Sequence, residues 1–193
     1  MDGKGHIEVR GFWRNWLVQQ FLGIQRLLRR PAPSIDFQAA FSTVKRILIV
    51  LPQDQQLCVD AAGMPAKLRH LFPSARCDFA LPDQCKELVP KNEYWGYTED
   101  ELTFLHLPNL RFIKKVQDMH YDLVISPSAD LDLFTAYLSL KSNAKLRVTF
   151  QSPQADQYFN MMIQPNPETD TSGKIDTLLK YLHLMQPIEQ PSY

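Results

Sequence analysis

Three apolar runs constrain the fold of this chain more than any other feature. They are the run Arg46-Ile-Leu-Ile-Val-Leu51, residues 121–125 and residues 145–150. The first is unbroken and rich in β-branched residues, which is typical of a strand that is buried on both faces of a parallel sheet. Segments with helical periodicity separate the runs, and this alternation of strands and helices predicts an α/β fold.

The remaining segments complete one Rossmann-like unit. We expect strands at residues 75–81 and 102–107, an aromatic turn at 94–97, and helices at 57–71, 83–88, 108–119, 131–140 and 173–185. Right-handed crossovers then give a single doubly wound parallel sheet of about five strands in the order 3-2-1-4-5. Residues 1–43 are predicted to form an N-terminal amphipathic helix and a connector, and residues 44–193 the Rossmann-like half-domain with its C-terminal helix.

Composition excludes several functional classes. Basic and acidic residues number 21 each, so the net charge is zero and nothing indicates nucleic acid as a partner. The 3 cysteines form no CxxC pair, which argues against a disulfide framework and favours a reducing compartment. The sequence shows no signal peptide, no apolar stretch of membrane-spanning length, no glycine-rich phosphate motif and no metal-ligand spacing of histidines. We therefore expect a cytoplasmic protein without a cofactor or a metal.

The segment 12–30 has helical periodicity, with aromatic and aliphatic residues on one side and arginines beside them. Such a helix lies on a membrane surface or on a protein partner, although packing on the sheet of its own domain would satisfy the same pattern. A membrane or partner contact would place the protein at the membrane periphery. The residues predicted to make this contact are Phe12, Trp13, Arg14, Trp16, Leu17, Phe21, Arg26, Arg29 and Arg30.

Three stretches carry a family resemblance. They are the run Arg46-Ile-Leu-Ile-Val, the helix end and following strand in residues 67–79, and the strand–helix–strand pattern of residues 121–150. Together they resemble the start of family 9 glycosyltransferases, the heptosyltransferase type, over residues 46 to about 165. The resemblance implies the N-terminal, acceptor-binding half of a two-domain enzyme. In that family the C-terminal half holds the nucleotide-sugar donor, and we expect this half to be absent here.

The loop after the first strand departs from the family pattern. The family usually has a Gly-Asp pair in this loop, and its aspartate is positioned as the general base, whereas this chain has Pro52-Gln-Asp-Gln-Gln56. Asp54 is the only candidate base, and a loop aspartate is more often a helix cap. Ligands of open α/β sheets bind at the carboxyl ends of the strands, so a crevice here would be lined by Asp54, Ser126, Ser128 and Asp130.

Two functions remain. The first is a non-catalytic adaptor or accessory subunit that docks on a larger, membrane-associated protein assembly, such as a photosynthetic or respiratory complex, because both the donor half and the base motif are missing. The alternative is the acceptor-binding half of a split, sugar-nucleotide-dependent glycosyltransferase, completed by a separate chain. The crevice distinguishes them, since Asp54 directed into it favours the enzyme and a crevice filled by side chains favours the adaptor.

Overall fold

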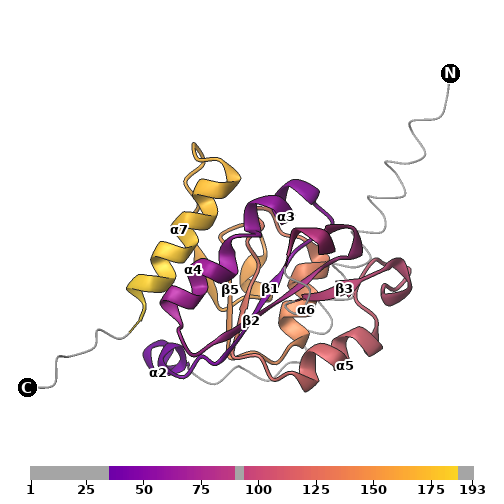
Figure 1. The fold of residues 1–193 in the computed structure, drawn as a ribbon, viewed down its shortest axis with the longest axis horizontal. Coiled ribbons are helices and arrows are strands. Elements are labelled where there is room, and N and C mark those ends of the chain that lie inside the picture. The colour runs from indigo at the N-terminus through magenta and orange to yellow at the C-terminus, as the bar shows by residue number, and fades with distance from the viewer. Residues whose placement is uncertain (1–34, 90–93, 187–193) are drawn as a thin grey trace, which may run out of the picture. The chain divides into compact units, whose positions relative to one another are not determined.

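The computed structural model describes residues 35–89 and 94–186, which belong to a compact unit that begins at Ile35. At its centre these residues form a six-stranded, all-parallel sheet in the order β3-β2-β1-β4-β5-β6 (Figure 1). The strands are β1 (Arg46–Val50), β2 (Arg76–Pro82), β3 (Tyr94–Tyr97), β4 (Leu123–Ile125), β5 (Leu146–Phe150) and β6 (Met161–Ile163). The predicted α/β class and the strand order are confirmed, and a sixth strand is added beside β5.

The central strand β1 is buried as its apolar sequence predicts. Residues 47–50 are fully shielded from solvent between β2 and β4. The start of β1 is held by a carboxylate, because Asp122 Oδ2 accepts hydrogen bonds from the backbone N–H groups of Lys45, at 2.9 Å, and Arg46, at 3.0 Å. This side chain therefore fixes the entry of β1 against the segment that leads into β4.

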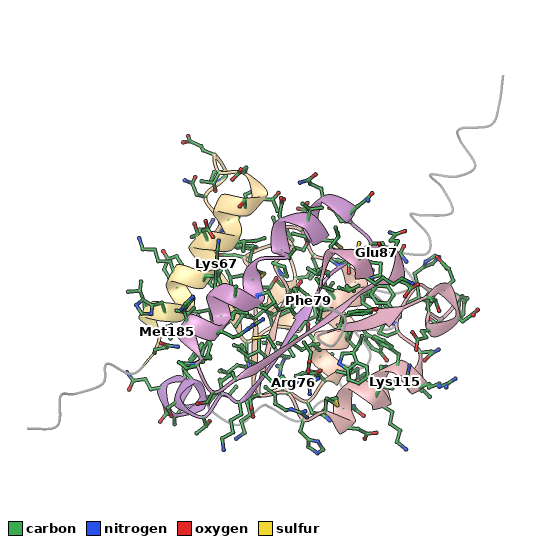
Figure 2. All side chains as sticks on the ribbon, viewed as in Figure 1. Lys67, Arg76, Phe79, Glu87, Lys115 and Met185 are labelled. Atoms are coloured by element: carbon green, nitrogen blue, oxygen red, sulfur yellow. The ribbon has the colours of Figure 1, made fainter. Side chains whose placement is uncertain are left out.

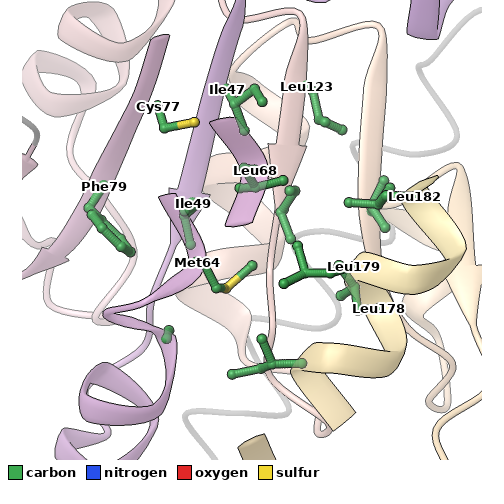
Figure 3. Close-up of a cluster of buried hydrophobic side chains, with 14 of the residues drawn as sticks. Ile47, Ile49, Met64, Leu68, Cys77, Phe79, Leu123, Leu178, Leu179 and Leu182 are labelled. Carbon is green, nitrogen blue, oxygen red and sulfur yellow. The ribbon is translucent and has the colours of Figure 1, made fainter. Parts of the chain in front are cut away.

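One face of the sheet carries the main hydrophobic core (Figure 3). Ile47, Ile49 and Phe79 project from the strands into this core. The helices α3 (Gln55–Ala61), α4 (Met64–Leu71) and α7 (Thr171–Leu184) contribute Leu57, Cys58, Ala61, Met64, Leu68, Leu178, Leu179 and Leu182. Charged side chains such as Lys67 and Glu87 lie outside this core, as Figure 2 shows. Burial of this continuous apolar surface is the main force that stabilises the unit.

The opposite face is covered by α5 (Leu110–Asp118) and α6 (Leu133–Lys141), which contact each other. Tyr97, Phe112 and Phe134 pack together there, outside the main core. Most helices begin at a side chain that accepts a hydrogen bond from the first turn. These caps are Asp36, Asp54, Asn109, Asp132 and Asp170.

The prediction of a strand at residues 102–107 is wrong. The third strand is β3, in the segment where the sequence predicts an aromatic turn. Residues 102–107 instead form a tight loop, in which the backbone N–H of Thr103 donates to the carbonyl of Leu107 at 2.7 Å and His106 has a positive φ of 56°. The apolar residues of this loop do not alternate between two faces of a sheet, because the chain turns back on itself.

Two further segments differ in detail. The helix predicted over residues 57–71 is divided at Gly63 into α3 and α4. The expected connector before β1 contains the short helix α2 (Phe37–Ser42), whose Phe41 is buried and stacks on Phe72 with ring centroids 6.3 Å apart. Short 3₁₀ turns complete the described elements: η1 (Asp83–Leu88), as predicted, η2 (Glu99–Glu101) and η3 (Ala155–Gln157).

Candidate functional site

The strand order reverses between β1 and β4. From β1 the chain proceeds outward to β2 and β3, then returns to β4 and continues in the other direction to β5 and β6. The carboxyl ends of β1 and β4 therefore flank the point at which open α/β sheets bind their ligands. The four predicted crevice residues, Asp54, Ser126, Ser128 and Asp130, all lie in the loops that follow these two strands.

Asp54 is the N-cap of α3. Its Oδ1 accepts a hydrogen bond from the backbone N–H of Leu57 at 3.1 Å, and its own backbone carbonyl accepts from Cys58. The side chain is exposed and borders an open depression lined otherwise by Gln53, Gln55, Gln56 and Val59. An N-cap carboxylate satisfies the free N–H groups of the first helical turn, which accounts for Asp54 without a catalytic role.

The serines after β4 are also engaged within the chain. Ser126 is 1% exposed, and its hydroxyl donates to Thr135 Oγ1 at 3.2 Å. Ser128 is half-buried and donates to the backbone carbonyl of Asp130 at 2.8 Å, while the Asp130 residue itself is exposed. Neither hydroxyl donates to a histidine, so the described residues contain no base that could activate these two serines as nucleophiles.

Tyr97 is the crevice residue that the sequence analysis missed. It lies at the end of β3, is 2% exposed, and donates a 3.0 Å hydrogen bond to the backbone carbonyl of Leu51, directly after β1. Its ring lies 4.2 Å from that of Phe134 and 6.0 Å from that of Phe112, measured between centroids. Burial, and then the charge of Asp132, raise the pKa of the Tyr97 phenol, so it remains a hydrogen-bond donor at neutral pH.

Asp132 connects this aromatic cluster to α6. Its Oδ1 accepts from the backbone N–H of Thr135 at 2.8 Å, which makes it the N-cap of α6. Burial raises the pKa of the Asp132 carboxyl, and the hydrogen bonds from Thr135 oppose this shift. An aspartate immediately before an apolar helical segment, here Leu133-Phe134, is the sequence signal that identifies this cap.

The described residues offer little further chemistry. No group of three or more His, Cys, Asp and Glu side chains in residues 35–89 and 94–186 is placed to hold a metal ion. The cysteines Cys58, Cys77 and Cys85 are all buried. Burial, and then the neighbouring Cys85, raise the pKa of the Cys58 thiol, so that it stays protonated and unreactive at neutral pH.

The predicted partner- or membrane-binding residues in 12–30 lie outside the described part of the chain, and their role stays a prediction. Within the part that is described, no helix combines the length and the apolar character needed to cross a bilayer.

The fold defines a Rossmann-like α/β protein. At the ends of β1 and β4, the side chains of Asp54, Ser126 and Ser128 make hydrogen bonds within the chain. A family model matches residues 24–185, and the chain belongs to this family, DUF6913, described as a family of unknown function. Comparison with curated proteins finds no match.

Solved structures of glycosyltransferases share the fold. E. coli heptosyltransferase WaaC with ADP is 13% identical with a TM-score of 0.57, covering 76% of this chain and 49% of its own. The same enzyme with ADP-2-deoxy-2-fluoro heptose is 13% identical with a TM-score of 0.58, covering 76% of this chain and 50% of its own. A family 9 glycosyl transferase from Veillonella parvula is 12% identical with a TM-score of 0.51, covering 69% of this chain and 41% of its own.

The predicted resemblance to family 9 glycosyltransferases is thus confirmed at the level of the fold. The chain spans about half the length of the heptosyltransferase structures that it matches. At identities of 12–13% the likeness concerns the fold alone, and it assigns neither substrate nor activity to this chain.

Proposed function

We propose that this chain is a non-catalytic adaptor, built on a glycosyltransferase-like half-domain, that docks on a larger protein assembly. The observation that carries this proposal is the engagement of a backbone carbonyl at the end of β1 by a side chain of the same chain. The phenol of Tyr97 bonds to the Leu51 carbonyl, and its ring packs on Phe134, at the place where a ligand would approach the ends of β1 and β4.

The surrounding polar groups support the same function. The Asp54 carboxylate caps α3, the Ser126 hydroxyl bonds to Thr135, and Asp132 caps α6. A catalytic base needs a carboxylate directed at the proton that it removes, and a binding crevice needs polar groups directed at the ligand. Each of these three groups instead stabilises the local fold.

A binding measurement on the full chain tests whether it has a nucleotide-sugar site of its own. The solved relatives hold ADP or an ADP-sugar, so we would titrate ADP and ADP-heptose into the purified protein by calorimetry. The adaptor proposal expects no heat of binding up to about 1 mM ligand, which corresponds to an affinity too weak for a dedicated site. Saturable binding of either ligand would contradict the proposal. A split transferase would hold its donor on the separate chain and would also show no binding here, so the partner measurement below separates the two functions.

The variant Asp54→Asn provides the matched control. An asparagine oxygen still caps α3, so the fold is retained while any general-base function is removed. If the chain bound an ADP-sugar and transferred the sugar to an acceptor, loss of transfer in Asp54→Asn with unchanged binding would identify Asp54 as the base.

A partner measurement tests the docking half of the proposal. The tagged chain would be purified gently from solubilised membranes, and the co-purified proteins identified by mass spectrometry. We expect recovery in a fixed ratio with subunits of a larger assembly. Recovery with one sugar-nucleotide-binding chain would support the alternative function, and recovery of the chain alone would contradict docking.

The segment 12–30 is the proposed contact with that partner or with a membrane surface. Replacing Trp13 and Trp16 by Glu places two charges among the aromatic residues of the segment, which opposes insertion into the lipid interface. Loss of binding to anionic phospholipid vesicles in this variant would support a lipid contact. Unchanged vesicle binding together with loss of the protein partners would assign the segment to a protein contact.

A further inference from the structure

We propose that residues 99–114 form the contact surface of a homodimer. These residues comprise η2, the tight loop that follows it and the first turn of α5, and they are called the 99–114 segment below. This inference concerns self-association, and it goes beyond the docking on a different partner proposed above.

The segment presents two large apolar side chains to solvent. Phe104 is 88% exposed and Leu110 is 82% exposed, more than any other large hydrophobic residue in the described part of the chain. Single exposed apolar residues are common on protein surfaces, but two of this size within seven residues of the chain make this segment a candidate contact surface. Aromatic residues at such positions supply much of the binding energy in protein interfaces.

The backbone beneath these side chains is held by a dense set of hydrogen bonds. Thr103 closes the loop, since its N–H donates to the Leu107 carbonyl at 2.7 Å and its hydroxyl accepts from the Leu107 N–H at 3.2 Å. At the base of the loop, the N–H of Asn109 donates to the Glu101 carbonyl at 2.8 Å, and the Asn109 side-chain amide donates to the Asp100 carbonyl at 3.0 Å.

An ion pair connects the first arm of the segment to α5, the helix that carries its second arm. Lys115 Nζ on α5 lies 2.5 Å from Glu101 Oε1 at the end of η2, and Lys115 can be located in Figure 2. Phe104 is therefore displayed on a preorganised loop, and little conformational entropy is lost when such a loop is buried in an interface.

The charges of the segment are self-complementary. Its first arm carries the exposed acids Glu99 and Asp100, and its second arm carries the exposed bases Arg111 and Lys114. Within residues 35–89 and 94–186, none of these four side chains forms an ion pair with another described residue. A two-fold axis beside Phe104 would bring the acidic arm of one copy against the basic arm of the other, twice, as an isologous interface requires.

This charge pattern fits a second copy better than an occupant of one charge sign. A partner of one charge sign, such as an anionic membrane, would attract one arm and be repelled by the other. The segment contains fewer residues than the roughly 20–30 per side of a stable interface, so we expect a weak dimer whose population depends on concentration.

The first experiment measures self-association of the full chain by sedimentation velocity between about 1 μM and 1 mM. We expect a concentration-dependent shift from monomer to dimer. Phe104→Ser should raise the dissociation constant about tenfold or more, as truncation of a central aromatic anchor does. The control Leu184→Ser alters another exposed apolar residue, 65% exposed at the end of α7, and should leave the constant unchanged.

A charge-reversal pair gives the decisive test. The variant Glu99→Lys/Asp100→Lys makes both arms basic, and the variant Arg111→Glu/Lys114→Glu makes both arms acidic. Each variant alone should fail to dimerise because like charges would face each other, whereas an equimolar mixture should form a heterodimer. Circular dichroism would confirm that both variants are folded.

Three outcomes would overturn the proposal. The first is a wild-type chain that remains monomeric throughout the concentration range. The second is self-association that is unaffected by Phe104→Ser, which would place the contact elsewhere, for example in residues 12–30. The third is a mixture of the two charge-reversed variants that stays monomeric. The second outcome has a particular case. If Phe104→Ser abolishes binding of a different protein partner and leaves self-association unchanged, the 99–114 segment docks on that partner and the homodimer is contradicted.

Discussion

The hydroxyl of Tyr97, at the end of β3, lies 3.0 Å from the backbone carbonyl of Leu51, directly after β1. Strand β2 separates these two strands in the sheet, so the phenol spans the width of one strand to reach its acceptor. The bond occupies a carbonyl at the carboxyl end of the central strand, where Rossmann-like proteins usually meet their ligands. The proposal of an adaptor therefore rests on one side chain, whose ring packs against Phe134.

Replacing Tyr97 by Phe tests the strength of this contact. The ring and its packing are retained, but the Leu51 carbonyl loses its donor at a buried position. We expect the free energy of unfolding to fall by about 1–3 kcal/mol, measured by urea denaturation. Tyr181→Phe removes a hydroxyl from a residue that is 47% exposed and should change the stability little. Equal stability of both variants would show that the Tyr97 hydrogen bond has no structural importance.

The Asp78 carboxylate on β2 is the most deeply buried charged group of the described residues. Its two oxygens accept hydrogen bonds from Arg76 Nε at 2.9 Å and from the Tyr121 hydroxyl at 3.0 Å, and the Trp95 indole donates to that hydroxyl at 2.8 Å. Asp78→Ala removes the shared acceptor and should lower the free energy of unfolding by about 2–4 kcal/mol.

Asp176→Ala is the matched control for Asp78→Ala. Asp176 also accepts from a cation, Lys67, but both members of this pair are more than half exposed, so its loss should cost less than about 1 kcal/mol. A similar loss in both variants would mean that the hydrogen bonds of Asp78 add nothing beyond an exposed ion pair.

The raised pKa of the Asp132 carboxyl predicts a specific dependence of stability on pH. Burial raises its folded-state pKa above the ordinary value of 3.8, so the folded chain binds this proton more tightly than the unfolded chain does. The contribution of Asp132 to stability is then greatest below pH 3.8 and is lost as the pH rises through its folded-state pKa. Asp132→Asn keeps the cap of α6 but cannot ionise.

Urea denaturation of both proteins at several pH values measures this effect. The stability of Asp132→Asn relative to the wild type should increase as the pH rises from acidic to neutral. A difference between the two proteins that does not change with pH would show that the carboxyl has the same pKa in the folded and unfolded states.

The sequence predicts the central strands well and the peripheral ones poorly, for a physical reason. Residues 47–50 are apolar because both faces of β1 are buried, so burial and sequence pattern coincide. At the edges, β3 has only four residues with Gly96 among them, and β6 has only three, so neither contains a recognisable period. The loop at 102–107 has a period, yet Phe104 faces solvent.

The candidate site shows the same distinction. Asp54, Ser126, Ser128 and Asp130 could be assigned to the strand ends from the sequence, because all of them lie in the loops that follow the apolar runs. The hydrogen bonds at the strand ends could not be predicted from the sequence. Ser126 bonds to Thr135 on the next helix, and the Leu51 carbonyl accepts from Tyr97, 46 positions away. Contacts of this range depend on the packing of α6 and β3, which no local pattern encodes.

Gly63, between α3 and α4, offers a prediction of increased stability. Its φ of −80° and ψ of −8° are ordinary for any L-residue, and a Cβ at this position would meet no atom within 4 Å. Gly63→Ala therefore restricts the unfolded chain without straining the folded one, and should raise the free energy of unfolding by about 0.4–1 kcal/mol. Gly96→Ala is the contrasting variant, because its Cβ would lie 2.9 Å from Asp83 Oδ1. This close contact should offset the same restriction of the unfolded chain, so Gly96→Ala should not be more stable than the wild type. If thermal and urea denaturation show Gly63→Ala to be less stable than the wild type, the break between the two helices requires a flexibility that the backbone angles do not indicate.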